Sequence, residues 1–385
     1  MNQFDVIIIG GGVVGLSAAL GMALQHYSVA VIDSGALNVD TTIYDLRVYA
    51  INKASQDLLG QLEVWPLLAD QRISPYKHMH VWDASNGAHI DFDSRSVAAP
   101  FLGHIIEESI LKEALLQQVK NNKSIQLFPC CSADEIKCTD STVTVFSTDQ
   151  TWTSKLLIIA DGANSPTRKK LNINDTHWSY HQHALVATVG VEKSHEQTAY
   201  QVFNSNGPLA FLPLKDSHQC SIVWSTDPEY AEDLKTLDED RFNTELTKAF
   251  AKELGQVKLM STRHTFPLQM RHVNQYAGDR WLLMGDAAHT IHPLAGLGLN
   301  VGLADVSAWL KLLSTKQGCL TAKKLLGSYQ RERKHAVWQT IVLMEGFKRL
   351  FSNSSLPVSA IRGLGLRLCN ESNLIKRYFI EHAGG

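Results

Sequence analysis

The first 160 residues carry short apolar runs that stop at glycines or polar turns. Phe4 to Ile9 is a β-branched run that ends at three glycines. Val13 to Gln25 is rich in the helix-favouring residues Leu and Ala, and Val29 to Ile32 is a second β-branched run. This order predicts a strand, a helix and a second strand. The strands of such a unit are parallel and are covered on both faces.

The spacing of apolar residues then changes from run to run. Tyr76 to Asp93 alternates apolar and polar residues around Asn86-Gly87, which predicts a tight hairpin and the start of an antiparallel sheet. Glu107 to Lys120 has the spacing of an amphipathic helix. Thr142 to Phe146 and Trp152 to Ile159 predict two further strands around a polar turn.

The second half of the chain divides into a strand-rich part and a helical part. Leu185 to Trp224 contains several strand-like runs separated by turn residues, so we expect a larger antiparallel sheet and a substrate domain there. After the glycine-rich segment Gly285 to Gly302 the pattern is helical, with breaks expected at Gly318, Pro357 and Gly363.

Length, charge and cysteine usage narrow the class of protein. A chain of 385 residues favours two domains, and a net charge of -2 gives no reason to expect a polyanionic partner, so we expect no nucleic acid. The six cysteines lack CxxC spacing and are interpreted as reduced thiols. The apolar run near the N-terminus has no basic segment before it and ends at glycines, which indicates a buried strand and not a signal peptide. No apolar stretch approaches the roughly 20 residues needed to span a bilayer.

The first candidate site is the glycine motif between the predicted strand and helix. Gly10, Gly12 and Gly15 fit GxGxxG, and Asp33 ends the next strand 18 residues after Gly15. Gly10 permits the turn, Gly12 lets the backbone approach a pyrophosphate, Gly15 allows close packing of helix and strand, and Asp33 can accept hydrogen bonds from a ribose. The alternative is a purely structural glycine turn. Strand, helix and acid together favour a dinucleotide, either FAD or NAD.

Two later motifs place an aspartate directly after an apolar strand. Asp161-Gly162 follows Ile158-Ile159, with Arg168 a little further on, and Gly285-Asp286 follows the run Trp281 to Met284. Taken alone, each is equally well a strand-to-loop turn in which Asp serves as a cap. Their order after the glycine motif resembles the flavoprotein aromatic hydroxylases of the para-hydroxybenzoate hydroxylase type.

Longer strings narrow this resemblance to the ubiquinone-biosynthesis hydroxylases, over nearly the whole chain. The strings are Asp45 to Ile51, Gly207 to Leu214 (GPLAFLPL), Ser221 to Ser225, Thr265 to Leu268, Thr290 to Asn300 and Arg362 to Leu366. The resemblance implies an FAD-binding α/β domain of Rossmann type, an inserted antiparallel sheet that forms the substrate domain, and a helical C-terminus. We expect the FAD domain at 1–75, 100–175 and 270–325, the substrate domain at 76–99 and 176–269, and the helical region at 326–385.

The resemblance also implies roles for individual residues. Asp161 would lie near the FAD pyrophosphate and Asp286 at the ribityl chain. Arg47 would lie beside the flavin and its phosphates. The loop residues Gly296, Gly298, Leu299 and Asn300 would offer backbone N–H groups to the isoalloxazine ring, and the candidate pocket residues Phe211, Pro213 and Pro293 would form an apolar wall that keeps water from the flavin. The alternative for Phe211 and Pro213 is that both are ordinary core residues of a strand. The catalytic base is not identified.

Three positions depart from the family pattern, and the histidines suggest a different kind of site. Leu297 stands where Gln is usual, Ser109 where many members have Arg, and Asp33 where Glu is more frequent. His289 and His292 are three residues apart, but no third ligand is evident, so we expect no metal. We interpret His289 as a hydrogen-bonding residue by the flavin.

The resulting hypothesis is an FAD-dependent monooxygenase that uses NAD(P)H and O₂ to hydroxylate a polyprenylated phenol or benzoquinol, with position C5 slightly favoured over the demethoxyubiquinol (C6) position. A flavin-dependent halogenase lacks support because Trp-x-Trp-x-Ile-Pro is absent. A non-catalytic FAD subunit of a biosynthetic complex stays open, as do contacts with other ubiquinone-biosynthesis proteins and a homo-oligomer. We expect a cytoplasmic protein. Its basic C-terminal residues Lys348, Arg349, Arg362, Arg367, Lys376 and Arg377 indicate either a solvated helix face or a peripheral contact with the inner membrane.

Overall fold

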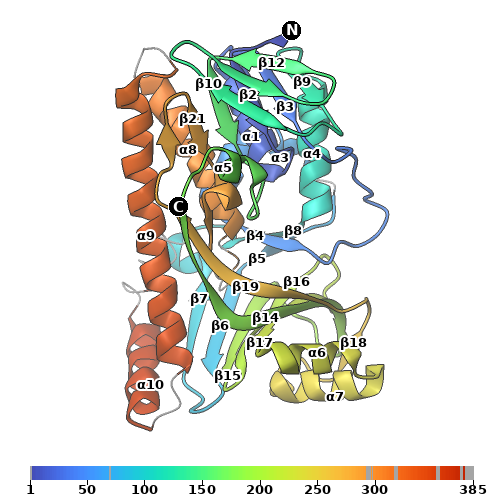
Figure 1. Ribbon diagram of the computed structural model, residues 1–385. Helices are drawn as coiled ribbons and strands as arrows, with labels where there is room; N and C mark the ends of the chain where they lie inside the picture. Colours follow the sequence, from blue (N-terminus) through green and yellow to red (C-terminus); the bar gives the residue numbers. More distant parts are fainter. Residues whose placement is uncertain are drawn as a thin grey trace.

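The computed structural model describes residues 2–68, 71–291, 296, 298–315, 320–352, 356–372 and 376–377. Within these ranges the chain forms four sheets: a mainly parallel sheet, a large sheet at the opposite end of the molecule, and two small sheets (Figure 1). No helix in this part of the chain is long and apolar enough to cross a membrane.

The parallel sheet is built from apolar strands that are buried on both faces. Its order is β20-β21-β13-β2-β3-β9, and all neighbours are parallel except the β20 and β21 pair. The helices α1 and α8 pack on each other beside it. The predicted strand–helix–strand unit is confirmed as β2, α1 and β3. The bounds are β2 Val6–Ile9, α1 Val13–Leu24, β3 Val29–Ile32, α4 Glu108–Lys120, β9 Ile125–Phe128, β13 Leu156–Ile159, β20 Ala277–Gly278, β21 Trp281–Leu283 and α8 Gly298–Thr315.

Two small sheets flank the parallel one. The first has the order β1-β12-β11-β10 and the second β4-β8-β5. The single strand expected over Trp152 to Ile159 is wrong. It divides at Lys155, whose exposed side chain pairs with Asp5, so that β12 joins a small sheet and β13 the parallel sheet. The bounds are β1 Asn2–Gln3, β4 Val48–Ile51, α2 Lys53–Gln61, α3 Trp65–Leu68, β5 Ile73–Tyr76, β8 Gly103–Glu107, β10 Glu135–Cys138, β11 Val143–Phe146, β12 Thr151–Ser154 and α5 Pro166–Lys170.

The large sheet runs in the order β22-β19-β14-β17-β16-β15-β6-β7, with β18 paired to β14. The hairpin predicted at Asn86-Gly87 is confirmed, and Gly87 has a φ of 68°. In Figure 1, α6 and α7 cover the face turned away from the parallel sheet. The bounds are β6 His78–Asp83, β7 His89–Asp93, β14 Asp175–Val191, β15 Thr198–Asn204, β16 Gly207–Pro213, β17 Gln219–Thr226, α6 Pro228–Thr236, α7 Glu239–Ala249, β18 Val257–Leu259, β19 His264–Val273 and β22 His289–Thr290.

Two helices follow the glycine-rich segment and run along the side of the molecule. α9 (Lys323–Ser352) extends from the parallel sheet to the large sheet, and α10 (Leu356–Glu371) packs against β7 (Figure 1). The break expected at Pro357 is confirmed, because α9 ends at Ser352 and α10 begins at Leu356, with Pro357 in its first turn, where proline is tolerated. The break expected at Gly363 is wrong, because Gly363 lies inside α10. Gly318 lies outside the described residues.

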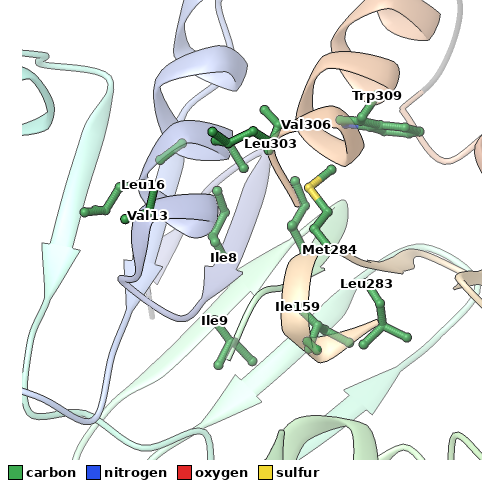
Figure 2. Packing of buried hydrophobic residues seen from close by; sticks show 14 of the residues in the cluster. Ile8, Ile9, Val13, Leu16, Ile159, Leu283, Met284, Leu303, Val306 and Trp309 are labelled. Carbon is green, nitrogen blue, oxygen red and sulfur yellow. The ribbon is translucent and has the colours of Figure 1, made fainter. Parts of the chain in front are cut away.

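The main core lies on both faces of the parallel sheet. Figure 2 shows Ile8 and Met284 beside Leu303 and Val306 of α8, while Ile9, Ile159 and Leu283 from three neighbouring strands lie on the other face of the sheet. These side chains are fully or almost fully buried. Because the three strands are parallel and in register, the turns that follow them meet at one edge of the sheet.

Candidate active site

The glycine motif leaves the first turn of α1 open. A Cβ on Gly10, whose φ is +110°, would lie 2.3 Å from the carbonyl oxygen of Ala160, and a Cβ on Gly15 would lie 1.9 Å from that of Gly10. A Cβ on Gly12 would meet nothing within 4 Å. Gly12 also provides no side-chain cap for α1, and the first turn has no acidic residue. Gly10 and Gly15 are therefore required for packing, whereas Gly12 keeps space in front of unpaired amide groups, which suits an anion.

Asp33 is fixed beside this turn. Its carboxylate accepts hydrogen bonds from the backbone N–H of Gly11 at 2.6 Å and from that of Gly35 at 2.7 Å. The carboxylate thus stands at the end of β3 next to the open first turn of α1.

The two aspartate turns are tied to each other by a buried arginine. Arg168, which is 2% exposed, donates hydrogen bonds to the carbonyl oxygens of Ala163 at 3.0 Å and Ala287 at 2.8 Å. One carboxylate oxygen of Asp161 accepts from the N–H of Thr167 at 3.0 Å, and the other, Oδ1, is buried without a partner. Buried polar atoms are nearly always hydrogen-bonded, so this oxygen fits a donor on a bound cofactor.

A second buried cluster, formed by His289, Asp305 and Arg333, supports the turn that carries Asp286. Asp305 of α8 accepts hydrogen bonds from the N–H of Gly285 at 2.8 Å, from His289 Nε2 at 2.7 Å and from Arg333 Nε at 2.6 Å. Burial alone would raise the pKa of Asp305, but His289 and Arg333 hold it below its usual value. His289 is thus a hydrogen-bonding residue, and its partner is Asp305. Asp305 and Arg333 were not predicted from the sequence. Asp305 gave a usable signal as a charged residue in the mainly apolar α8, whereas Arg333 is one of many charged residues in α9.

Asp286 and Arg47 lie close enough for their charges to interact. Burial raises the pKa of Asp286, while the charges of His289 and Arg47 oppose the shift. Arg47 contacts Glu108 at 3.1 Å and its side chain is 63% exposed. The carboxylate of Asp45 orients this segment, since it accepts the N–H of Arg47 at 2.9 Å and that of Ser109 at 3.0 Å.

Asn300 fastens the start of α8 to β4. Its amide donates to the carbonyl oxygen of Ala50 at 2.7 Å and accepts the N–H of Asn52 at 3.1 Å. Gly296 has a φ of +63°, and a Cβ there would lie 3.1 Å from the Cβ of Ala50. Gly298 and Leu299 begin α8. Pro293, Leu297 and His292 lie outside the described residues, and within the described ranges no group of three or more potential ligands could hold a metal ion.

A cavity of about 110 Å³ lies between this segment and the large sheet. One side is formed by Val48, Ala50, Tyr76, Ile105 and Gly296, and the other by residues of four strands: Met79 of β6; Ala199, Tyr200 and Gln201 of β15; Pro208, Ala210 and Leu212 of β16; and Val223 and Ser225 of β17. Burial raises the pKa of Tyr76 to about 12, so its hydroxyl stays protonated at neutral pH.

The structure corrects the expected pocket residues Phe211 and Pro213. Side chains alternate along β16, and the cavity is lined by Pro208, Ala210 and Leu212. Phe211 is on the opposite face, stacked on Phe250 with 3.7 Å between ring centroids. By the same alternation, Pro213 faces away from the cavity.

Comparisons with known proteins agree with this arrangement. Residues 3–343 match the model of a family described as "FAD binding domain". The 3-demethoxyubiquinol 3-hydroxylase of Escherichia coli is 32% identical, with 99% of this chain and 98% of the relative covered. The human ubiquinone biosynthesis monooxygenase COQ6 is 30% identical, with 99% and 92% covered. The crystal structure of p-nitrophenol 4-monooxygenase PnpA from Pseudomonas putida has a TM-score of 0.82 at 17% identity, with 100% of this chain and 99% of that chain covered, and shows the same fold.

The open glycine turn, the unpaired Asp161 oxygen and the attachment of the start of α8 to β4 fit FAD, and the family match covers most of the chain. The chain belongs to the family of FAD-dependent monooxygenases that includes the ubiquinone-biosynthesis hydroxylases.

Proposed function

We propose that this protein hydroxylates the aromatic ring of a polyprenylated phenol or benzoquinol during ubiquinone biosynthesis, with NAD(P)H as electron donor and O₂ as oxygen source. The names of the two relatives described above support a role in ubiquinone biosynthesis. The observation that carries the proposal is the cavity between Gly296 and the large sheet, because it is mostly apolar and adjoins the loop expected at the flavin. Bound FAD supplies the redox and oxygen-activating chemistry of this family.

The residues proposed to hold FAD lie at one edge of the parallel sheet. The first turn of α1 would receive the pyrophosphate through its free amides, and Asp33 would accept hydrogen bonds from the ribose. Asp161, Asp286 and Arg47 lie on the turns and the segment around this edge. Gly296 and the first residues of α8 would lie along the flavin ring.

The chain itself would orient the ring and exclude water. Apolar side chains and small residues line most of the cavity, which limits water at the reacting centre. The protonated hydroxyl of Tyr76 can donate a hydrogen bond to a ring substituent. A substrate held in one orientation next to the flavin gains rate through proximity.

We also propose the domain division expected from the sequence. The FAD domain would comprise 1–75, 100–175 and 270–325, and the parallel sheet supports this since its strands come from those segments. The substrate domain would comprise 76–99 and 176–269, which contain most of the large sheet. Residues 326–385 would form the C-terminal region.

A peripheral membrane contact is proposed for the face of α9 that carries apolar side chains. Trp338, Val342 and Leu343 are 41%, 64% and 47% exposed, and Arg349 follows them on the same helix. Exposed apolar and basic side chains together suit an anionic lipid surface, where a polyprenylated substrate would reside. Flotation of the holoenzyme with anionic vesicles tests this contact. Equal flotation of wild type and Val342→Glu/Leu343→Glu would contradict it.

Complementation tests the proposed reaction and names the ring carbon. The protein is expressed in bacterial strains that are each blocked at one ring hydroxylation, and quinones are identified by mass spectrometry. The C5 position is the first candidate, and similarity to 3-demethoxyubiquinol 3-hydroxylase supports the demethoxyubiquinol position as the second. Restored ubiquinone in one strain would support hydroxylation at that carbon. Lack of rescue in every strain, despite soluble yellow protein, would contradict the proposal and favour a non-catalytic FAD subunit.

A further inference from the structure

The floor of the cavity is a row of side chains on three neighbouring strands. Gln201 of β15 is opposite Ala210 of β16, which in turn is opposite Val223 of β17. Ser225 lies two residues beyond Val223 and therefore on the same face. Ser225 therefore lies diagonally across β16 from Gln201, and the small side chain of Ala210 leaves space between the two.

The polar groups of Gln201 and Ser225 have no hydrogen-bond partner among the described residues, although both side chains line the cavity. Ser225 is only 3% exposed and Gln201 is half-buried. Other polar residues around the cavity are placed differently. Tyr76 comes from the opposite wall, and the ring of Tyr200 is turned to the other face, where it contacts Phe250. Buried groups of this kind are normally satisfied, so a ligand is the expected partner.

Strand spacing sets the distance between these two groups. Adjacent strands lie about 4.8 Å apart, so β15 and β17 are separated by about 10 Å across β16, and Ser225 is offset from Gln201 by two residues, about 7 Å along the strands, so that their Cα atoms are about 12 Å apart. A six-membered ring set diagonally over Ala210, with oxygens on opposite carbons and a hydrogen bond of about 2.8 Å at each end, spans about 11 Å and fits this separation.

No charged side chain is found among the described residues that line the cavity. A ring carboxylate would lose its hydration there without gaining a counter-charge, which is unfavourable. A neutral hydroxyl or methoxy oxygen has no such penalty.

We propose that Gln201 and Ser225 bind two oxygen substituents on opposite sides of the substrate ring, and that they select a neutral dioxygenated ring over a ring with one oxygen or with a carboxylate. This rests on the proposed function, because it takes the cavity to be the substrate site. It assigns both residues to specificity and favours a quinol-type ring as the substrate class.

Binding to the oxidised holoenzyme tests the proposal without turnover. The probes carry one isoprene unit each: a prenylated 1,4-hydroquinone, the matched phenol and the matched 4-hydroxybenzoate. Dissociation constants are obtained from the change in flavin absorbance. We expect wild type to bind the hydroquinone about tenfold more tightly than the phenol, and the benzoate most weakly. Gln201→Leu and Ser225→Ala should each weaken hydroquinone binding about fivefold to tenfold and reduce its advantage over the phenol.

Thr226→Val is the matched control for Ser225→Ala. Thr226 is the next residue on β17 and also has a buried hydroxyl without a partner, but it faces the opposite side of the sheet. The Thr226→Val variant should leave all three dissociation constants unchanged. If Gln201→Leu fails to fold, Gln201→Met keeps the side-chain length and is measured in its place.

Two results would overturn the proposal: equal binding of the hydroquinone by wild type and both floor variants, or no preference of wild type for the hydroquinone. A different result is expected if the protein binds the ring but is not a hydroxylase. Wild type would then bind the hydroquinone with the expected preference but would show no ring-dependent NAD(P)H oxidation and no hydroxylated product.

Discussion

Asp305→Ala should destabilise the protein more than any other single truncation near the site. Asp305 is fully buried and accepts three hydrogen bonds, two of them from Arg333 and His289, which are 7% and 1% exposed. Its removal leaves a guanidinium in the interior without a counter-charge. Breaking a buried pair in this way costs about 3–5 kcal/mol of unfolding free energy, a large share of the roughly 5–15 kcal/mol of a typical domain.

The same substitution should weaken FAD binding. Asp305 fixes the N–H of Gly285 and, through His289, the far end of the turn that carries Asp286. Without this support the turn is no longer held in one geometry. We therefore expect a higher dissociation constant for FAD even under conditions where the variant is folded.

Urea unfolding followed by circular dichroism gives the change in stability, and flavin fluorescence gives the dissociation constant. The matched control is a double-mutant cycle with Arg333→Met, which removes the unpaired cation that Asp305→Ala leaves behind. The double variant should be more stable than the sum of the single changes predicts, by about 1–3 kcal/mol. A loss below about 1 kcal/mol for Asp305→Ala, with unchanged FAD binding, would refute this account of the cluster.

Two further predictions concern glycines and histidines. Gly12→Val should fold but lose FAD, since a Cβ at Gly12 meets nothing, whereas Gly15→Val should fail to fold because its Cβ would lie 1.9 Å from a carbonyl oxygen. Circular dichroism and flavin content after purification separate the two outcomes, and loss of fold in both variants would contradict the contrast. Burial lowers the pKa of His104 and of His272 to about 4, below the unfolded value near 6.5. The unfolded chain then binds more protons between these values, so stability should fall as the pH drops from about 6.5 to 4, by at most about 3 kcal/mol per histidine. His104→Phe should flatten this slope in urea unfolding at pH 4.5 to 7, and an unchanged slope would contradict the assignment.

The parts of the site that depend on local sequence were predictable. The unit of β2, α1 and β3 follows from adjacent apolar runs and the glycines between them, and each glycine has a local steric reason. The cluster behind Asp286 was not predictable in this way. Its members His289, Asp305 and Arg333 come from β22, α8 and α9, and only the packing of these elements brings their charges together.

The pocket residues show a second limit, which arises from strands that are apolar on both faces. Alternation along β16 indicates that Ala210 and Leu212 share one face and Phe211 the other, but the run GPLAFLP does not show which face borders the cavity. Both faces are covered, one by Phe250 at the end of α7 and the other by the segment around Ala50 and Gly296. The large aromatic side chain of Phe211 fills the face that packs on Phe250, and the small side chain of Ala210 leaves space on the face that borders the cavity. On such a strand, substrate contacts are therefore better sought at small residues flanked by unpaired polar groups than at the largest aromatic side chain.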